Sequence, residues 1–125
     1  MAFFSRVRSK FLNAFRGLLL AFTTDNSFKV HLFFSAVVIG IGVGLKASAV
    51  DWALLAIAIG LVVVAELFNT AIEYLVRMFT TEYHELAGKL LDISAGAVLF
   101  ASLIALVLAG IVFVPLAMTA MRVTP

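Results

Sequence analysis

Three long apolar runs constrain the fold of this chain more than any other feature. They cover residues of about 28–46, 50–75 and 90–114. An α-helix rises about 1.5 Å per residue, so each run is long enough to cross the roughly 30 Å hydrocarbon core of a bilayer. In lipid, only helices and closed barrels satisfy their own backbone hydrogen bonds. The runs therefore predict an all-α membrane protein with three transmembrane helices.

The composition supports this interpretation. Of the 125 residues, 64% are hydrophobic and only 13% are charged. A soluble fold of this size could not hide so much apolar surface from water. The length fits a single domain, residues 1–125. The sequence has no cysteine, which excludes disulfides and thiolate metal sites.

The sequence pattern of residues 3–24, approximately, predicts an amphipathic helix. Apolar side chains such as Phe4, Phe11 and Phe15 recur every three or four positions, while Arg6 and Arg16 occupy other faces. A basic amphipathic helix rich in phenylalanine is typical of a segment that lies along the membrane surface. The alternative is a core-facing helix of a soluble bundle, which the rest of the composition does not favour.

Basic residues gather on one side of the predicted membrane. The N-terminal side and the loop between the second and third spans carry Arg6, Arg8, Lys10, Arg16, Lys29, Arg77 and Lys89. The opposite side has only Lys46 and Arg122. Because basic residues are enriched in cytoplasmic loops, we expect the N-terminus and the second loop to be cytoplasmic.

The third predicted span has a small residue at every fourth position. These residues are Ala97, Ala101, Ala105 and Ala109. Such a stripe lets helix backbones approach one another closely within a membrane. Three helices make a thin bundle, so we expect the chain to oligomerise, although the stripe does not fix the number of subunits. Pro115 is predicted to end this helix.

The stretch Glu66-Leu-Phe-Asn-Thr-Ala-Ile-Glu73 is the most informative about function. Helical periodicity places Glu66, Asn69, Thr70 and Glu73 on one face of the second span. Carboxylates in a membrane helix are costly, so they are functional candidates by default. For Asn69 and Thr70 the alternative is a hydrogen-bond cluster that joins helices. Two carboxylates fit that alternative less well, because burying acids costs more than burying amides.

Further acidic residues are expected at the same membrane face, namely Asp25, Glu82, Glu85 and Asp92. Carboxylate oxygens suit a hard cation such as Mg²⁺, which proteins often share with bound phosphates. Glu85 can equally be interpreted as a solvated loop residue.

Taken together, these motifs resemble the bacterial integral-membrane diacylglycerol kinase and undecaprenol kinase family. The resemblance covers about 6–115 and rests on 66–73, Glu82-Tyr-His-Glu-Leu86 and Asp92-Ile-Ser-Ala-Gly-Ala-Val98, with looser matches at 14–18 and 28–31. It implies a homotrimer in the bacterial inner membrane, with a surface helix and three spans per subunit and a cytoplasmic active site. It also implies that ATP and Mg²⁺ serve to phosphorylate the hydroxyl of a membrane lipid alcohol. No nucleic-acid partner is implied.

The resemblance assigns roles to individual residues. Glu66 matches the general base, Asn69 a polar partner in the active site, and Asp92 an acidic residue of the site. Asp25 and Glu73 match carboxylates that bind the Mg²⁺ and its nucleotide. The other implied nucleotide-binding residues are Arg6, Glu82, His84 and Lys89. The lipid-binding residues are Glu66 itself with Arg16, Lys29 and His31. Lys29 and His31 look more like the undecaprenol branch, which favours undecaprenol over diacylglycerol.

Two positions depart from the family pattern. Leu91 stands where the family typically has a lysine, and Asp25 stands where it usually has a glutamate. Lys89 lies about 200° from Leu91 on a helix, so it replaces that lysine only if the helix starts late. One alternative is therefore a catalytically weak or inactive relative that binds nucleotide or lipid. Another is a small proton-coupled transporter that uses Glu66, although its acids lie at one interface instead of the bilayer midplane.

Overall fold

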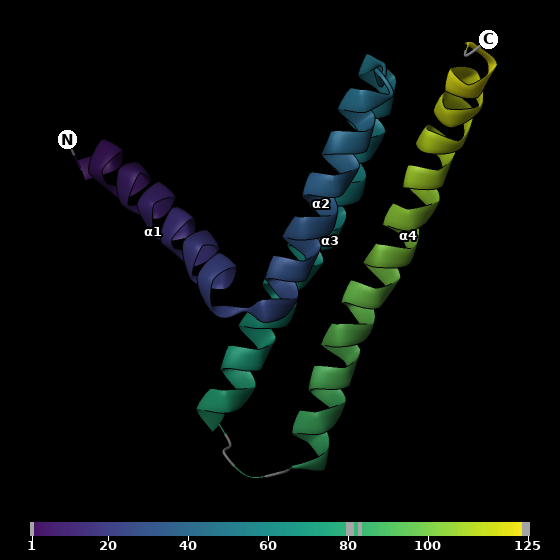
Figure 1. Cartoon of the computed structure of the whole chain (residues 1–125). Helices are drawn as coiled ribbons and strands as arrows, with labels where there is room; N and C mark the ends of the chain where they lie inside the picture. The colour runs from purple at the N-terminus through teal and green to yellow at the C-terminus, as the bar shows by residue number, and fades with distance from the viewer. Residues whose placement is uncertain (1, 80–81, 83, 124–125) are drawn as a thin grey trace.

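The chain forms four helices joined by short connections. A computed structural model describes residues 2–79, 82 and 84–123. The helices are α1 (Ala2–Thr24), α2 (Asn26–Gly44), α3 (Ala49–Phe79) and α4 (Glu85–Val123). Figure 1 shows α2, α3 and α4 side by side, with α1 leading away at an angle. All regular structure in the described residues is helical, which confirms the predicted fold class.

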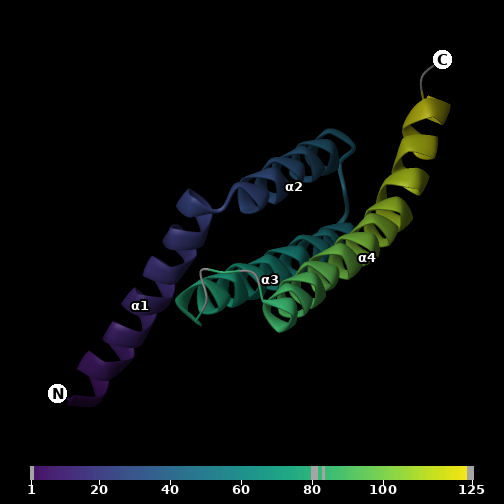
Figure 2. The ribbon, with the colours of Figure 1, turned by 90° about the horizontal axis from the view of Figure 1, so that it is seen from below.

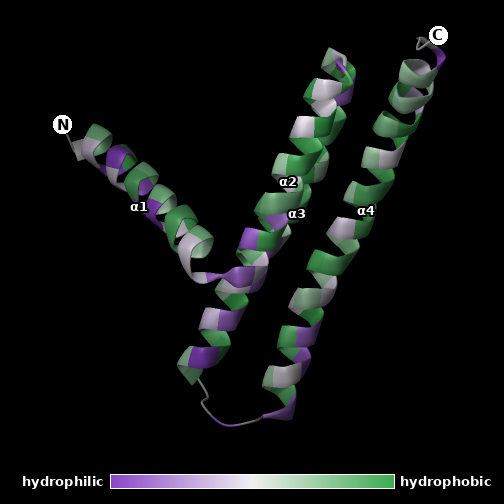
Figure 3. Cartoon of the chain, in the orientation of Figure 1, coloured by the Kyte–Doolittle hydropathy of each residue, from purple (hydrophilic) through white to green (hydrophobic). Residues whose placement is uncertain are grey.

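Three of these helices are long and apolar enough to span a membrane. Their spans of 19, 31 and 38 residues measure about 28, 46 and 57 Å, against a hydrocarbon core of roughly 30 Å. α3 and α4 are therefore longer than the core is thick. Figure 3 shows polar residues at the adjoining ends of these two helices. The chain is a membrane protein with three spanning helices.

The spanning helices pack thinly and leave much of their apolar surface outside the chain. α3 packs mainly on α4 and less extensively on α2. Leu55 and Val112 are fully buried between helices, whereas Phe33, Phe100 and Leu106 are exposed. Soluble proteins rarely expose apolar patches of this extent, but lipid chains solvate them.

The predicted N-terminal helix is present as α1. Only its C-terminal part packs against the other helices, where Ala21 is buried and Phe22 meets Phe28 edge to face at 4.6 Å between ring centroids. Phe4 and Phe11 remain exposed along the part that leads away from the bundle in Figure 2. An uncovered apolar stripe suits a position along the membrane surface, which stays a prediction.

The prediction that Pro115 ends the last helix is wrong. α4 continues through Pro115 to Val123, and it begins at Glu85, ahead of the predicted span. Proline removes one backbone donor, but helices in membranes tolerate it where neighbouring groups compensate. The helix continues past the proline, and one turn later the hydroxyl of Thr119 donates to the carbonyl oxygen of Pro115 at 2.9 Å. α3 likewise extends beyond its predicted limit, to Phe79.

The small-residue stripe of α4 serves the contact with α3. Ala101 is buried, and Ala105 and Ala109 line a cavity that also involves α2 and α3. Ala58 of α3 is buried opposite. Ala97, the first residue of the predicted stripe, is exposed, so the stripe contributes to the packing on α3 only from Ala101 onward.

Candidate functional site

The polar face predicted for α3 is present and buried except at Glu73, which is partly exposed. Glu66 is 1% exposed, and Asn69 and Thr70 are also buried. The amide of Asn69 donates to Oε1 of Glu73 at 3.2 Å, and the Thr70 hydroxyl lies 3.0 Å from the backbone carbonyl of Glu66. Helical periodicity aligns these four residues on one side of the helix. They form the core of the candidate site.

Asp25 brings the start of α2 into this site. One oxygen of its carboxylate, Oδ1, accepts from the backbone N–H of Ser27 at 2.8 Å and of Phe28 at 3.4 Å, which caps α2. Aspartate is among the preferred residues for this capping position. The other oxygen, Oδ2, accepts from the hydroxyl of Thr70 at 2.6 Å. A single side chain therefore both begins α2 and joins it to α3.

Ser94 brings α4 into the same site. Its hydroxyl is buried and donates to Oδ1 of Asn69 at 2.8 Å, and it lies 2.9 Å from the carbonyl oxygen of Leu91. Asn69 therefore links Ser94 on one side to Glu73 on the other. The sequence prediction missed Ser94 as a site residue. Its signal was weak, since it is one hydroxyl in an otherwise apolar run.

Glu66 occupies an unusual electrostatic position. Its Oε1 is buried and has no hydrogen-bond partner among the described residues. Nε2 of His31, on α2, lies 4.0 Å from this oxygen. Asp25 and Glu73 are the carboxylates whose negative charge acts on Glu66. Arg77 balances part of that charge, with Nη2 3.4 Å from Oε2 of Glu73.

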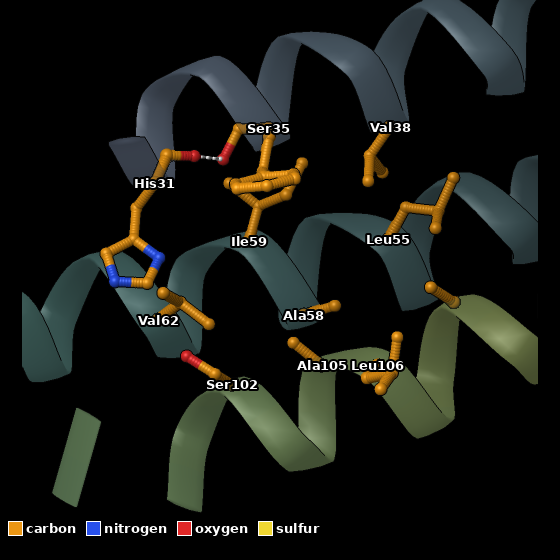
Figure 4. A pocket seen from close by; sticks show the side chains of 12 residues that line it. His31, Ser35, Val38, Leu55, Ala58, Ile59, Val62, Ser102, Ala105 and Leu106 are labelled. Carbon is orange, nitrogen blue, oxygen red and sulfur yellow. Dashed lines mark hydrogen bonds between the residues drawn. The ribbon is translucent and has the colours of Figure 1, made fainter. Parts of the chain in front are cut away.

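The site adjoins an apolar cavity of about 340 Å³ between α2, α3 and α4. His31 lies at one end of this cavity, and Val38 and Leu55 lie toward the other (Figure 4). The lining is mostly aliphatic and includes Phe34, with Ser35 and Ser102 as further polar residues. The imidazole of His31 therefore stands between the carboxylates and an apolar space.

A second hollow, of about 530 Å³, lies between α1 and α3. Ala14, Gly17 and Leu18 form one side, and Thr70 and Tyr74 contribute to the other. The hydroxyl of Tyr74 donates to Oγ1 of Thr24 at 3.2 Å, which ties the end of α1 to α3. The polar face of α3 is thus flanked by apolar spaces on two sides.

The oxygen donors of the cluster suit a hard divalent cation. Asp25, Asn69 and Glu73 supply carboxylate and amide oxygens, which Mg²⁺ prefers. Within the described part of the chain, no three acidic or histidine side chains are placed to hold a metal ion by themselves. Phosphate and water oxygens would have to supply the remaining ligands, as is usual for Mg²⁺ in nucleotide sites.

Other predicted site residues lie apart from this cluster. Asp92 is exposed on α4, two residues before Ser94 and therefore on a different side of the helix. Glu82 and His84 are exposed in the segment between α3 and α4, and Tyr83 of the same motif falls outside the described residues. Arg6 and Arg16 are exposed on α1.

The two predicted lysines have partners of their own. Lys89 is 64% exposed and pairs with Oε1 of Glu85 at 2.6 Å. α4 already begins at Glu85, so Lys89 points away from the position of Leu91 and does not replace a lysine there. Lys29 is exposed and donates to Oδ1 of Asn26 at 3.2 Å.

Comparison with known proteins gives consistent matches over most of the chain. Residues 12–113 match the family described as prokaryotic diacylglycerol kinase. A diacylglycerol kinase of Synechocystis is 38% identical over 106 residues, which cover 84% of this chain and 61% of that protein. An undecaprenol kinase of Bacillus subtilis is 31% identical over 111 residues, which cover 89% and 90%. A diacylglycerol kinase of Escherichia coli is 30% identical over 104 residues, which cover 83% and 85%.

Proposed function

The chain belongs to the prokaryotic diacylglycerol kinase family and is therefore a lipid kinase, and from this premise we propose how its residues act. The proposed reaction transfers the γ-phosphoryl group of ATP to the hydroxyl of a membrane lipid alcohol. One observation carries the proposal. A buried carboxylate, Glu66, lies where an oxygen-rich polar cluster meets an apolar cavity.

Glu66 is proposed as the general base. It accepts the proton of the lipid hydroxyl while the hydroxyl oxygen attacks the γ-phosphorus, and ADP leaves with the bridging oxygen. A carboxylate buried beside an apolar cavity is placed to take that proton from a lipid hydroxyl. Its position on a spanning helix lets a lipid reach it by lateral diffusion, so the acceptor never leaves the bilayer.

Asp25 and Glu73 are proposed to hold Mg²⁺ with the nucleotide. The cation would offset charge on the phosphates, and the remaining work of phosphoryl transfer is positioning. Asn69 orients Glu73 through their hydrogen bond and is itself held by Ser94. The hydrogen bonds of Thr70 and Arg77 to these two carboxylates keep both at the cluster until nucleotide binds.

The remaining nucleotide contacts are proposed at Arg6, Glu82, His84 and Lys89, with Asp92 as a further acidic group of the site. These side chains are exposed at or beyond the polar ends of the helices, where ATP arrives from water. Since they lie apart from the Glu66 cluster in a single chain, we propose a homotrimer in which neighbouring subunits approach one another. The basic N-terminal side is proposed to be the cytoplasmic face of a bacterial inner membrane.

Undecaprenol is proposed as the preferred acceptor and diacylglycerol as the second. Lys29 and His31 support this order because they look like the undecaprenol branch of the family. Arg16 is a third proposed contact with the lipid. The cavity beside His31 supports an acceptor with an apolar chain, because its lining offers hydrocarbon contacts almost exclusively.

A catalytically weak relative is the second candidate, and one observation favours it. Leu91 cannot offset phosphate charge, and Lys89 is paired with Glu85 instead of compensating. Electrostatic stabilisation is usually the largest part of such catalysis, so this loss could cost much of the rate.

A radiolabelled-ATP assay in mixed micelles tests the proposal. Purified protein is given Mg·ATP with undecaprenol, diacylglycerol or another lipid alcohol, beside Glu66→Gln as the matched control. We expect labelled lipid phosphate from the natural protein and none above background from the variant. If no lipid is labelled while the protein still binds ATP, the weak-relative candidate takes its place. Proton flux into liposomes without ATP would instead support a transporter.

A further inference from the structure

We propose that His31 is a positioning residue for Glu66, with its Nε2–H closing onto Oε1 when the lipid acceptor is bound. This inference rests on the proposed function, because it gives the base of that reaction a partner. Three observations carry it: a distance, an unsatisfied oxygen and the location of the imidazole.

The distance places His31 one small movement from a hydrogen bond. Nε2 of His31 and Oε1 of Glu66 are 4.0 Å apart, whereas an N–H···O bond spans about 2.7–3.2 Å. Hydrogen bonds at catalytic sites are often long before substrate binds and tighten in the complex. The His31 side chain is 25% exposed, so it has room to move, whereas Glu66 is held almost without exposure.

The Glu66 oxygen that the imidazole of His31 would reach lacks a hydrogen-bond donor within the described structure. Oε1 of Glu66 is the one buried side-chain oxygen or nitrogen in the described residues that lacks a hydrogen bond. Leaving a charged group buried and unpaired is costly. The nearby carboxylates of Asp25 and Glu73 add repulsion. In the described part of the chain, His31 is the sole basic side chain within 4.0 Å of Glu66.

The location of the imidazole couples this contact to the acceptor. His31 lines the end of the apolar cavity, and its ring extends from α2 toward Val62 of α3 and Ser102 of α4 (Figure 4). A lipid that fills the cavity displaces water from the ring. With water gone, the N–H has Oε1 as its nearest strong acceptor, and the bond gains strength in the drier surroundings.

With this contact formed, the two oxygens of the Glu66 carboxylate would have different roles. Oε1 accepts from His31 and fixes the plane of the carboxylate, while Oε2 takes the proton of the lipid hydroxyl. The O–H bond of the lipid breaks, the proton stays on Glu66, and His31 keeps its own proton throughout. Holding the carboxylate in one orientation raises the fraction of complexes that are ready to react.

Two substitutions at His31 separate positioning from packing. His31→Gln places an amide N–H near the position of Nε2, and His31→Leu fills similar space without a donor. We expect His31→Leu to lower kcat by about 10- to 100-fold, as befits a lost hydrogen bond to a charged group. We expect His31→Gln to recover most of that loss, with the KM for ATP unchanged in both. Thr119→Ala is the matched control, because Thr119 is exposed near the far end of α4 and its hydroxyl donates to a backbone carbonyl of its own helix, that of Pro115. We expect that control to keep its kcat.

Several outcomes would overturn the inference while leaving the lipid kinase activity in place. One is natural kcat in His31→Leu. Another is a raised KM for the lipid with unchanged kcat, which would make His31 a headgroup contact. A third is an equal loss in His31→Gln and His31→Leu. If the natural protein itself phosphorylates no lipid, the proposed function fails instead, and the two failures are distinct.

A measurement without turnover keeps the inference testable if a variant folds poorly. The side-chain ¹⁵N resonances of His31 are recorded with a lipid alcohol bound, in the natural protein and in Glu66→Leu. His84 is the only other histidine, so His84→Asn assigns the signals. We expect a proton on Nε2 and a shift of that resonance on losing Glu66. An unchanged resonance would show that the two side chains do not meet.

Discussion

The hydroxyl of Thr70 and the carboxylate of Asp25 meet at 2.6 Å, although 45 positions separate them in the sequence. This contact joins the first turn of α2 to the buried polar face of α3. Both oxygens of Asp25 are used in the absence of nucleotide, one for the helix cap and one for Thr70.

Replacing Thr70 by valine should weaken the contact between α2 and α3. Valine keeps the shape of threonine but removes the donor, so Oδ2 of Asp25 loses its partner. We expect the free energy of unfolding to fall by about 1–3 kcal/mol, as for other hydrogen bonds to charged groups. Unfolding in a denaturing detergent, followed by circular dichroism, measures the change. Thr70→Ser is the matched control and should stay close to the natural protein; an equal loss in both would assign the effect to the methyl group.

Changing Glu66 or Glu73 to glutamine should impair the reaction in different ways. Glu66→Gln cannot accept a proton, so we expect kcat to fall by about 100-fold or more with little change in the KM for Mg·ATP. Glu73→Gln should weaken Mg²⁺ binding by about tenfold or more, and added Mg²⁺ should recover part of its rate. Steady-state kinetics over a range of Mg²⁺ concentrations distinguishes the two. Recovery of Glu66→Gln by Mg²⁺ would contradict the roles assigned here.

The sequence predicts best what lies within one helix. Glu66, Asn69, Thr70 and Glu73 are spaced so that helical periodicity alone sets them on one face, and the structure places all four there. The three spans followed from the length of their apolar runs. These predictions depend only on local geometry and on lipid as the surrounding solvent.

What could not be predicted lies between helices. α2 and α4 are apolar around most of their circumference, so their sequences do not indicate which side faces α3. The contacts of Asp25 with Thr70 and of Ser94 with Asn69 depend on that rotation. The prediction that Pro115 ends its helix was wrong for a related reason. The rule that proline ends a helix holds best for helices exposed to water, whereas helices in membranes tolerate proline.

We expect Ser94 to affect stability and nucleotide binding through Asn69, to which its hydroxyl donates a hydrogen bond. Ser94→Ala removes the donor to Oδ1 of Asn69 and leaves the amide of Asn69 freer to turn away from Glu73. We expect a loss of about 0.5–1.5 kcal/mol in the free energy of unfolding and a rise in the KM for Mg·ATP. Ser102→Ala, on the same helix but lining the apolar cavity, is the comparison and should leave that KM unchanged. Equal kinetic effects in both variants would argue against a specific role for the Ser94 contact.

Introducing a lysine at position 91 should strengthen catalysis. Leu91 is half-buried one turn before the Ser94 contact, and its own carbonyl oxygen lies 2.9 Å from the Ser94 hydroxyl. An ammonium there would reach toward the phosphates that Lys89, paired with Glu85, does not approach. We expect Leu91→Lys to raise kcat or lower the KM for ATP by several-fold, a gain of about 1 kcal/mol in transition-state binding. Leu90→Lys adds the same charge at an exposed neighbouring position and should change neither quantity. A fall in both rate and affinity on Leu91→Lys would show that another group already neutralises the phosphates at this site.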